Sequence, residues 1–132
     1  MTVVYYVMDG DDMLISTMAA RSKTKAVARD GRVSLCVLDE RWPPGYLQVY
    51  GSAEVSRDRD LAVDVLARVV GVMAGEPVPE SRLPQIAQMA DDEQRVAIRV
   101  TPYATFETPP RHVAAMSDLD TLTHFTSTSM PW

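Results

Sequence analysis

Three cationic residues fall at alternate positions near the end of residues 16–25, a segment that follows an apolar stretch. They are Arg21, Lys23 and Lys25. The pattern predicts the first turns of a helix, where the partial positive charge disfavours each cation by about 0.3–1 kcal/mol. A bound anion removes this penalty, because free backbone N–H groups, the helix dipole and cationic side chains together hold a phosphate. The segment therefore predicts a phosphate-binding site.

Hydroxyl side chains in the same segment could add further donors. They are Ser16, Thr17, Ser22 and Thr24. A second interpretation needs no ligand: the cations form a solvated helix face, and Ser22 is a simple N-cap. The charge pattern alone does not choose between the two interpretations.

Other kinds of chemistry find little support in the sequence. The single cysteine, Cys36, lies in an apolar run, so we expect a buried, inert thiol and no disulfide within the chain. The acidic residues of the segment 9–12 lack the spacing of a calcium loop and are expected to form a turn. His112 and His124 are too isolated to be metal ligands, so we expect no metal site and assign no catalytic residue.

The elements that must position the cationic segment are mostly hairpin strands. Strands are expected at residues 3–8, 13–18, 32–38, 46–56, 95–100 and 103–107, with helices at 19–29, 58–74 and 81–90. This order favours an antiparallel barrel with helices at its rim over a parallel nucleotide-binding sheet. The predicted fold class is therefore mainly β, a β-rich α+β domain over residues 1–113, followed by a C-terminal tail over residues 114–132.

Several local patterns make these expectations specific. Alternation in residues 46–56 places Leu47, Val49, Gly51, Ala53 and Val55 on one face of a strand. The nearly all-apolar run 32–38 indicates burial on both faces, and Gly31 is expected as a left-handed C-cap. The helix at 58–74 has a single apolar stripe. That stripe consists of Leu61, Val65, Leu66, Val69 and Met73.

The order of these motifs resembles a known family. The segments Leu14-Ile15-Ser16-Thr17, Arg21-Ser22-Lys23, 30–35 and 46–55 together resemble the pyridoxamine 5′-phosphate oxidase-like flavin-binding split-barrel superfamily. The chain looks most like the actinobacterial branch that uses the deazaflavin coenzyme F-420, over roughly residues 3–110. The resemblance implies an antiparallel split β-barrel with two or three flanking helices, and a homodimer with two cofactor sites at the subunit interface.

The resemblance also implies roles for individual residues. Arg21 and Lys23 match the pair that binds the cofactor phosphate, with Ser22 between them and Thr24 beside them. Ser16 and Thr17 match residues that line the ribityl chain and ring edge. Gln48 matches a glutamine that reaches the cofactor, often from the other subunit, and is otherwise a surface strand residue. Trp42 and Tyr46 lie in a matching loop, where they cover the ring or belong to the dimer core.

The chain departs from its relatives at the N-terminus. Relatives usually begin with a helix and a further strand, which lines the isoalloxazine site, ahead of the strand expected here at residues 3–8. This sequence has neither, so we expect an exposed strand edge there. Either the start codon is misassigned or another chain covers this edge.

Composition limits the remaining classes of function. The net charge of -5 argues against a general nucleic-acid or anionic-membrane binder. No apolar run approaches the roughly 18 residues of a transmembrane helix, no secretory signal is visible, and a single cysteine favours the cytoplasm.

Three functional hypotheses remain. The first is an oxidoreductase that uses F-420 or FMN to transfer hydride to or from a conjugated small-molecule substrate, in which the cofactor supplies the redox chemistry. The alternative is a non-catalytic protein that binds or stores a flavin, a deazaflavin or a haem-derived ligand. A cofactor-free structural dimer is the third.

Overall fold

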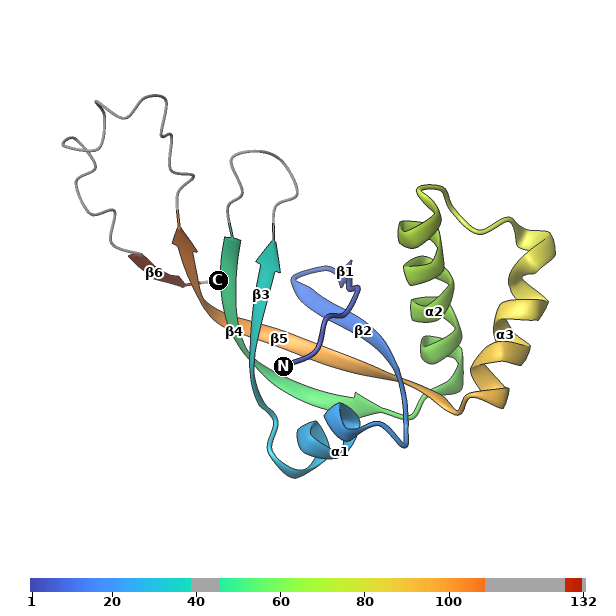
Figure 1. Cartoon of the computed structure of the whole chain (residues 1–132), viewed down its shortest axis with the longest axis horizontal. Helices are drawn as coiled ribbons and strands as arrows, with labels where there is room; N and C mark the ends of the chain where they lie inside the picture. Colours follow the sequence, from blue (N-terminus) through green and yellow to red (C-terminus); the bar gives the residue numbers. More distant parts are fainter. Residues whose placement is uncertain (39–45, 109–127, 132) are drawn as a thin grey trace. The chain divides into compact units, whose positions relative to one another are not determined.

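The computed structural model describes residues 1–38, 46–108 and 128–131. Strands in this part of the chain are β1 (Val7–Asp9), β2 (Asp12–Met18), β3 (Arg32–Leu38), β4 (Tyr46–Ser56), β5 (Arg95–Thr108) and β6 (Thr128–Pro131). They pair in the order β1-β2-β5-β4-β3, and β6 pairs with β5 (Figure 1). Helices are α1 (Ser22–Arg29), α2 (Arg59–Ala74) and α3 (Leu83–Asp92), with a 3-10 turn η1 (Glu80–Arg82) before α3. The predicted β-rich α+β class is confirmed.

The chain divides into two compact units, and each is described by itself. The first unit comprises residues 1–33 and 52–101, and the second comprises the described parts of residues 34–51 and 102–132. Both the cationic segment and the three helices belong to the first unit.

The core of the first unit lies between α2 and the β1–β2 hairpin. In the antiparallel register Val7 lies opposite Leu14, and Ser16 lies opposite Ala97 of β5. Val7, Leu14 and Ala97 form one buried cluster with Val65 and Val69 of α2. The stripe expected on this helix is thus confirmed in part. Its last member, Met73, is exposed near the end of the helix.

Helix α2 begins and ends where the sequence predicts. The Asp58 carboxylate accepts hydrogen bonds from the backbone N–H groups of Asp60 and Leu61 at 2.9 and 3.1 Å, which satisfies donors that lack intrahelical partners. Gly75 ends the helix in a left-handed conformation with φ of 77°. Helix α3 lies beside α2 (Figure 1) and begins two residues later than expected, because η1 occupies the first turn.

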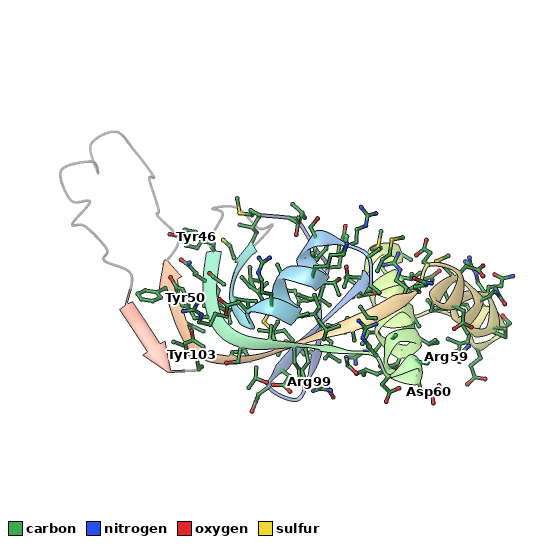
Figure 2. All side chains as sticks on the ribbon, turned by 90° about the horizontal axis from the view of Figure 1, so that it is seen from below. Tyr46, Tyr50, Arg59, Asp60, Arg99 and Tyr103 are labelled. Carbon is green, nitrogen blue, oxygen red and sulfur yellow. The ribbon has the colours of Figure 1, made fainter. Side chains whose placement is uncertain are left out.

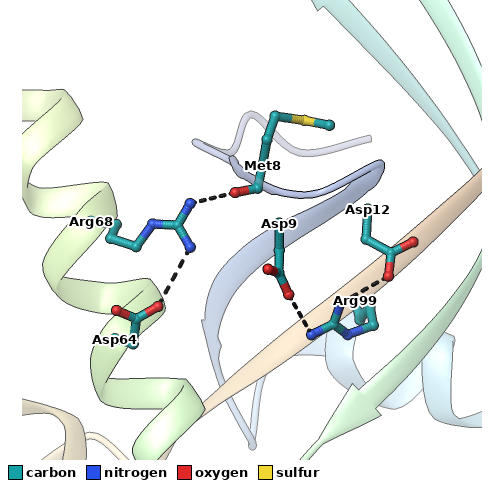
Figure 3. Close-up of polar contacts among 6 residues, drawn as sticks. All are labelled: Met8, Asp9, Asp12, Asp64, Arg68 and Arg99. Atoms are coloured by element: carbon teal, nitrogen blue, oxygen red, sulfur yellow. Dashed lines mark hydrogen bonds and ion pairs between the residues drawn. The ribbon is translucent and has the colours of Figure 1, made fainter.

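Two arginines hold the tip of the β1–β2 hairpin (Figure 3). The guanidinium of Arg99 on β5 lies 2.8 Å from the carboxylates of both Asp9 and Asp12. Arg68 of α2 donates a hydrogen bond to the Met8 carbonyl. The hairpin is therefore anchored from a neighbouring strand and from a helix.

The N-terminal strand expected at residues 3–8 is wrong over most of its length. Pairing starts at Val7, and the preceding residues lie outside any strand. Met1, Val3 and Tyr5 are exposed. Their β propensity reflects side-chain packing on a half-buried surface, whereas these three side chains are exposed.

Two expectations around α1 are also corrected. The helix begins at Ser22 rather than at residue 19, so Arg21 is the N-cap and Ser22 is not. Asp30 is its C-cap in an extended conformation, so Gly31 is not a left-handed cap. Gly31 is instead required by close approach, because a Cβ atom there would lie 2.5 Å from the Ala53 carbonyl oxygen.

The second unit contains residues 34–38 of β3, residues 46–51 of β4 and residues 102–108 of β5. Exposed and half-buried residues alternate along β3, so its expected burial on both faces is wrong, and Cys36 is exposed rather than buried. The alternation expected in β4 is confirmed, with Val49 and Gly51 buried. Its bounds, Tyr46–Ser56, are those predicted. The expected strands at 95–100 and 103–107 form one strand, β5, which continues through Pro102.

Candidate functional site

The predicted cationic segment lies where β2 turns into α1. Beyond the last β2 residue, Met18, the Ala19 N–H donates to the Gln94 carbonyl at 3.0 Å. The Arg21 N–H then turns back to the Met18 carbonyl at 3.2 Å, and the first helical bond runs from the Lys25 N–H to the Arg21 carbonyl at 3.2 Å. These contacts use residues 19–21 for the turn, which explains why the helix starts later than its propensity suggests.

Thr24 lies beneath this turn and is 3% exposed. Its hydroxyl donates a hydrogen bond of 2.8 Å to the Met18 carbonyl. It also lies 3.5 Å from the hydroxyl of Thr17, which is likewise buried. Two of the predicted site residues therefore meet in the interior and join β2 to α1.

The start of α1 carries positive charge and has no cap. Arg21 at the N-cap offers no capping side chain, and the first turn contains no acidic residue. The first backbone N–H groups of a helix have no intrahelical acceptor, and at the start of α1 no side-chain cap replaces it. Arg21 and Ser22 are exposed, and Lys23 is half-buried. In the described part of the chain no carboxylate pairs with Arg21 or Lys23.

Ser16 lies on the opposite face of β2 from Thr17. Successive residues of a strand point to opposite faces, and Leu14, two residues before Ser16, packs in the cluster formed with Val65 of α2. The Ser16 hydroxyl is buried and has no hydrogen-bond partner among the described residues. The structure thus brings Thr17, Thr24 and the cationic turn together and places the Ser16 side chain on the α2 side.

The remaining predicted residues belong to the second unit. The Gln48 amide donates to the Ser34 hydroxyl at 3.0 Å. Tyr46, at the start of β4, is exposed (Figure 2). Trp42 lies outside the described residues, as do His112 and His124.

Several features bear on other kinds of site. In the described residues no group of His, Cys, Asp or Glu could hold a metal ion. Nor is any described helix long and apolar enough to span a bilayer. Sequence reasoning did not identify the Met18 carbonyl, which accepts hydrogen bonds from the Arg21 N–H and the Thr24 hydroxyl at the cationic turn. Every residue has a backbone carbonyl, so the residue type does not reveal which carbonyl accepts these hydrogen bonds.

Comparisons with known proteins bear on the family and the fold. A family model described as pyridoxamine 5′-phosphate oxidase matches residues 1–108. This range contains β1 through β5 and the whole cationic turn. A search of curated proteins found no match.

Solved structures share the fold. A conserved hypothetical protein from Mycobacterium tuberculosis matches with a TM-score of 0.72 at 22% identity, covering 86% of this chain and 71% of that one. A structure named as an F-420 reductase matches with a TM-score of 0.55 at 24% identity, covering 77% and 74%. A putative pyridoxamine 5′-phosphate oxidase from Listeria innocua matches with a TM-score of 0.51 at 16% identity, covering 77% and 72%.

Proposed function

The chain belongs to the pyridoxamine 5′-phosphate oxidase family of split-barrel proteins, and from this premise we propose that it is an oxidoreductase that binds FMN or the deazaflavin coenzyme F-420 at the start of α1. The proposed reaction is hydride transfer to or from a conjugated small-molecule substrate. Members of this family include flavin-related oxidoreductases.

The observation that carries the proposal is the uncapped, cationic start of α1. A helix N-terminus normally attracts acidic or hydroxyl side chains and disfavours cations. Here Arg21 and Lys23 occupy that position without any described carboxylate beside them. A phosphate placed among them reverses the electrostatic penalty and gives the free N–H groups an acceptor.

The residues present fit such a cofactor. Arg21, Lys23 and the N–H groups of the first turn are proposed to hold the phosphate. Thr17 and Thr24 lie on the buried side of this turn. Gln48 is proposed to reach the cofactor of the other subunit. The bound cofactor supplies the hydride chemistry, while the chain binds and orients it.

Two cations further along α1 bear on the choice between the cofactors. F-420 carries an anionic lactyl-polyglutamyl tail beyond the position where FMN ends. Lys25 and Arg29 are exposed on α1 and offer positive charge to such a tail. Lys25→Ala is therefore expected to weaken F-420 binding severalfold and to change FMN binding by less than about twofold. The named F-420 reductase among the structural neighbours supports including F-420.

We propose a homodimer as the functional form. Leu38 on β3, Tyr46 on β4 and Tyr103 on β5 are exposed in the second unit, at 72%, 41% and 57%. These three strands are neighbours in the sheet, and we propose that a partner subunit covers the apolar side chains that they leave exposed. Light scattering after gel filtration tests this, and a monomer at micromolar concentration would contradict it.

Titration of the full chain with FMN and with F-420, followed by fluorescence quenching, tests the proposed function. Saturable binding of at least one cofactor is expected. Binding must be followed by turnover: the reduced cofactor, mixed with enone or quinone acceptors, is expected to be oxidised at a rate that depends on protein concentration. Binding without turnover of any acceptor would favour the storage protein, and failure to bind either cofactor would reject both functions.

A further inference from the structure

The N-termini of α1 and α2 are capped differently. In α2 the Asp58 carboxylate takes up the N–H groups of Asp60 and Leu61. In α1 no side chain caps the first turn. A helix start without a cap is less stable by about 1 kcal/mol, so something else must hold α1 in place.

Thr24 supplies that support from the buried side of the helix. Its hydroxyl donates to the Met18 carbonyl at 2.8 Å, and the same carbonyl accepts the Arg21 N–H at 3.2 Å. One backbone oxygen at the end of β2 thus accepts hydrogen bonds from the N–H of the N-cap residue and from a side-chain hydroxyl of the first turn. Neither bond uses the N–H groups of residues 22–24.

The side chain of Thr24 has no access to an outside ligand. It is 3% exposed, and the neighbouring Thr17 is 2% exposed. A group in this position can orient the turn, but its hydroxyl does not reach a phosphate that lies outside the helix.

We propose that Thr24 is a positioning residue, which fixes the first turn of α1 on the Met18 carbonyl and so keeps its N–H groups open for the cofactor phosphate. This inference rests on the proposed function. In this proposal Thr24 makes no contact with the cofactor. It acts by holding the turn that carries Arg21 and Lys23.

A measurement without ligand separates positioning from direct contact. In Thr24→Val, which keeps the shape but loses the hydroxyl, hydrogen exchange of the Arg21 and Lys25 amides is expected to be faster than in the wild type. Thr24→Ser keeps the donor and is expected to restore slow exchange. Unchanged exchange in Thr24→Val would overturn the proposal, and the melting temperature of each variant shows that the fold persists.

Cofactor titration completes the test, with riboflavin as a probe that lacks the phosphate. Loss of one hydrogen bond predicts that Thr24→Val weakens FMN binding by about two- to tenfold. Riboflavin binding is expected to change less, and Thr24→Ser to match the wild type. Wild-type affinity of Thr24→Val for FMN would overturn the positioning role alone, whereas a wild type that binds neither FMN nor F-420 would overturn the proposed function as well.

Discussion

Arg99 lies 2.8 Å from Asp12, and the two side chains join β5 to the beginning of β2 (Figure 3). About a quarter of each side chain is exposed. The hydrogen bond from Arg99 lowers the pKa of the Asp12 carboxyl below its usual value of 3.8. Because Arg99 also contacts Asp9, its charge holds both ends of the turn between β1 and β2.

Arg99→Met is expected to lower the free energy of unfolding at neutral pH by about 1 kcal/mol. The lowered pKa of Asp12 means that its contribution is present above the ordinary value of 3.8 and is lost as the pH falls through the folded value. The difference from the wild type should therefore shrink in acid. Urea unfolding across this range measures it, with the exposed Arg82→Met as control. A difference that grows in acid would contradict this origin.

Arg21→Asp is expected to change stability and binding in opposite directions. An aspartate at the N-cap accepts free N–H groups of the first turn and removes a repelled cation, which stabilises the helix by about 0.5–2 kcal/mol. The same change places a negative charge where the phosphate is proposed to bind, so FMN affinity should fall by more than about tenfold. Thermal melts and FMN titration measure the two effects.

The matched control is Arg29→Asp, at the other end of α1. There a cation lies favourably in the last turn, so the variant should lose about 0.3–1 kcal/mol of stability and keep its FMN affinity. If Arg21→Asp were destabilised like Arg29→Asp, the start of α1 would not be the uncapped, cationic terminus described.

Ser16→Ala is expected to leave the free protein unchanged or to stabilise it by up to about 1 kcal/mol. The Ser16 hydroxyl is buried without a partner among the described residues, and an unsatisfied buried polar group is costly. Chemical unfolding without cofactor measures this. A loss of more than about 1 kcal/mol would show that the hydroxyl has a stabilising partner.

Local patterns predicted much of the fold. Alternation identified β4 over Tyr46–Ser56, and the apolar stripe identified α2, whose ends at Asp58 and Gly75 follow from capping chemistry that acts within a few residues. For the candidate site, the sequence placed Arg21 and Lys23 near the start of a helix, where the structure has them as N-cap and first-turn residue. Their binding of a phosphate stays a prediction.

Long-range contacts account for what the sequence could not predict. The start of α1 depends on the Gln94 carbonyl, which accepts the Ala19 N–H and lies far away in the sequence, between α3 and β5. Residues 1–6 have strand propensity but form no strand, and Met1, Val3 and Tyr5 among them are exposed. In β3 an apolar run suggested two buried faces, yet Cys36 is exposed, because a run of apolar residues does not reveal which face another element covers.

The central claim, that the cationic turn binds the cofactor phosphate, is tested most directly with Lys23→Ala in parallel titrations with FMN and riboflavin. Loss of a charge-assisted contact predicts that FMN binds at least about tenfold more weakly, with riboflavin affinity nearly unchanged and added salt reducing the difference. Equal FMN affinity for Lys23→Ala and the wild type would contradict the claim.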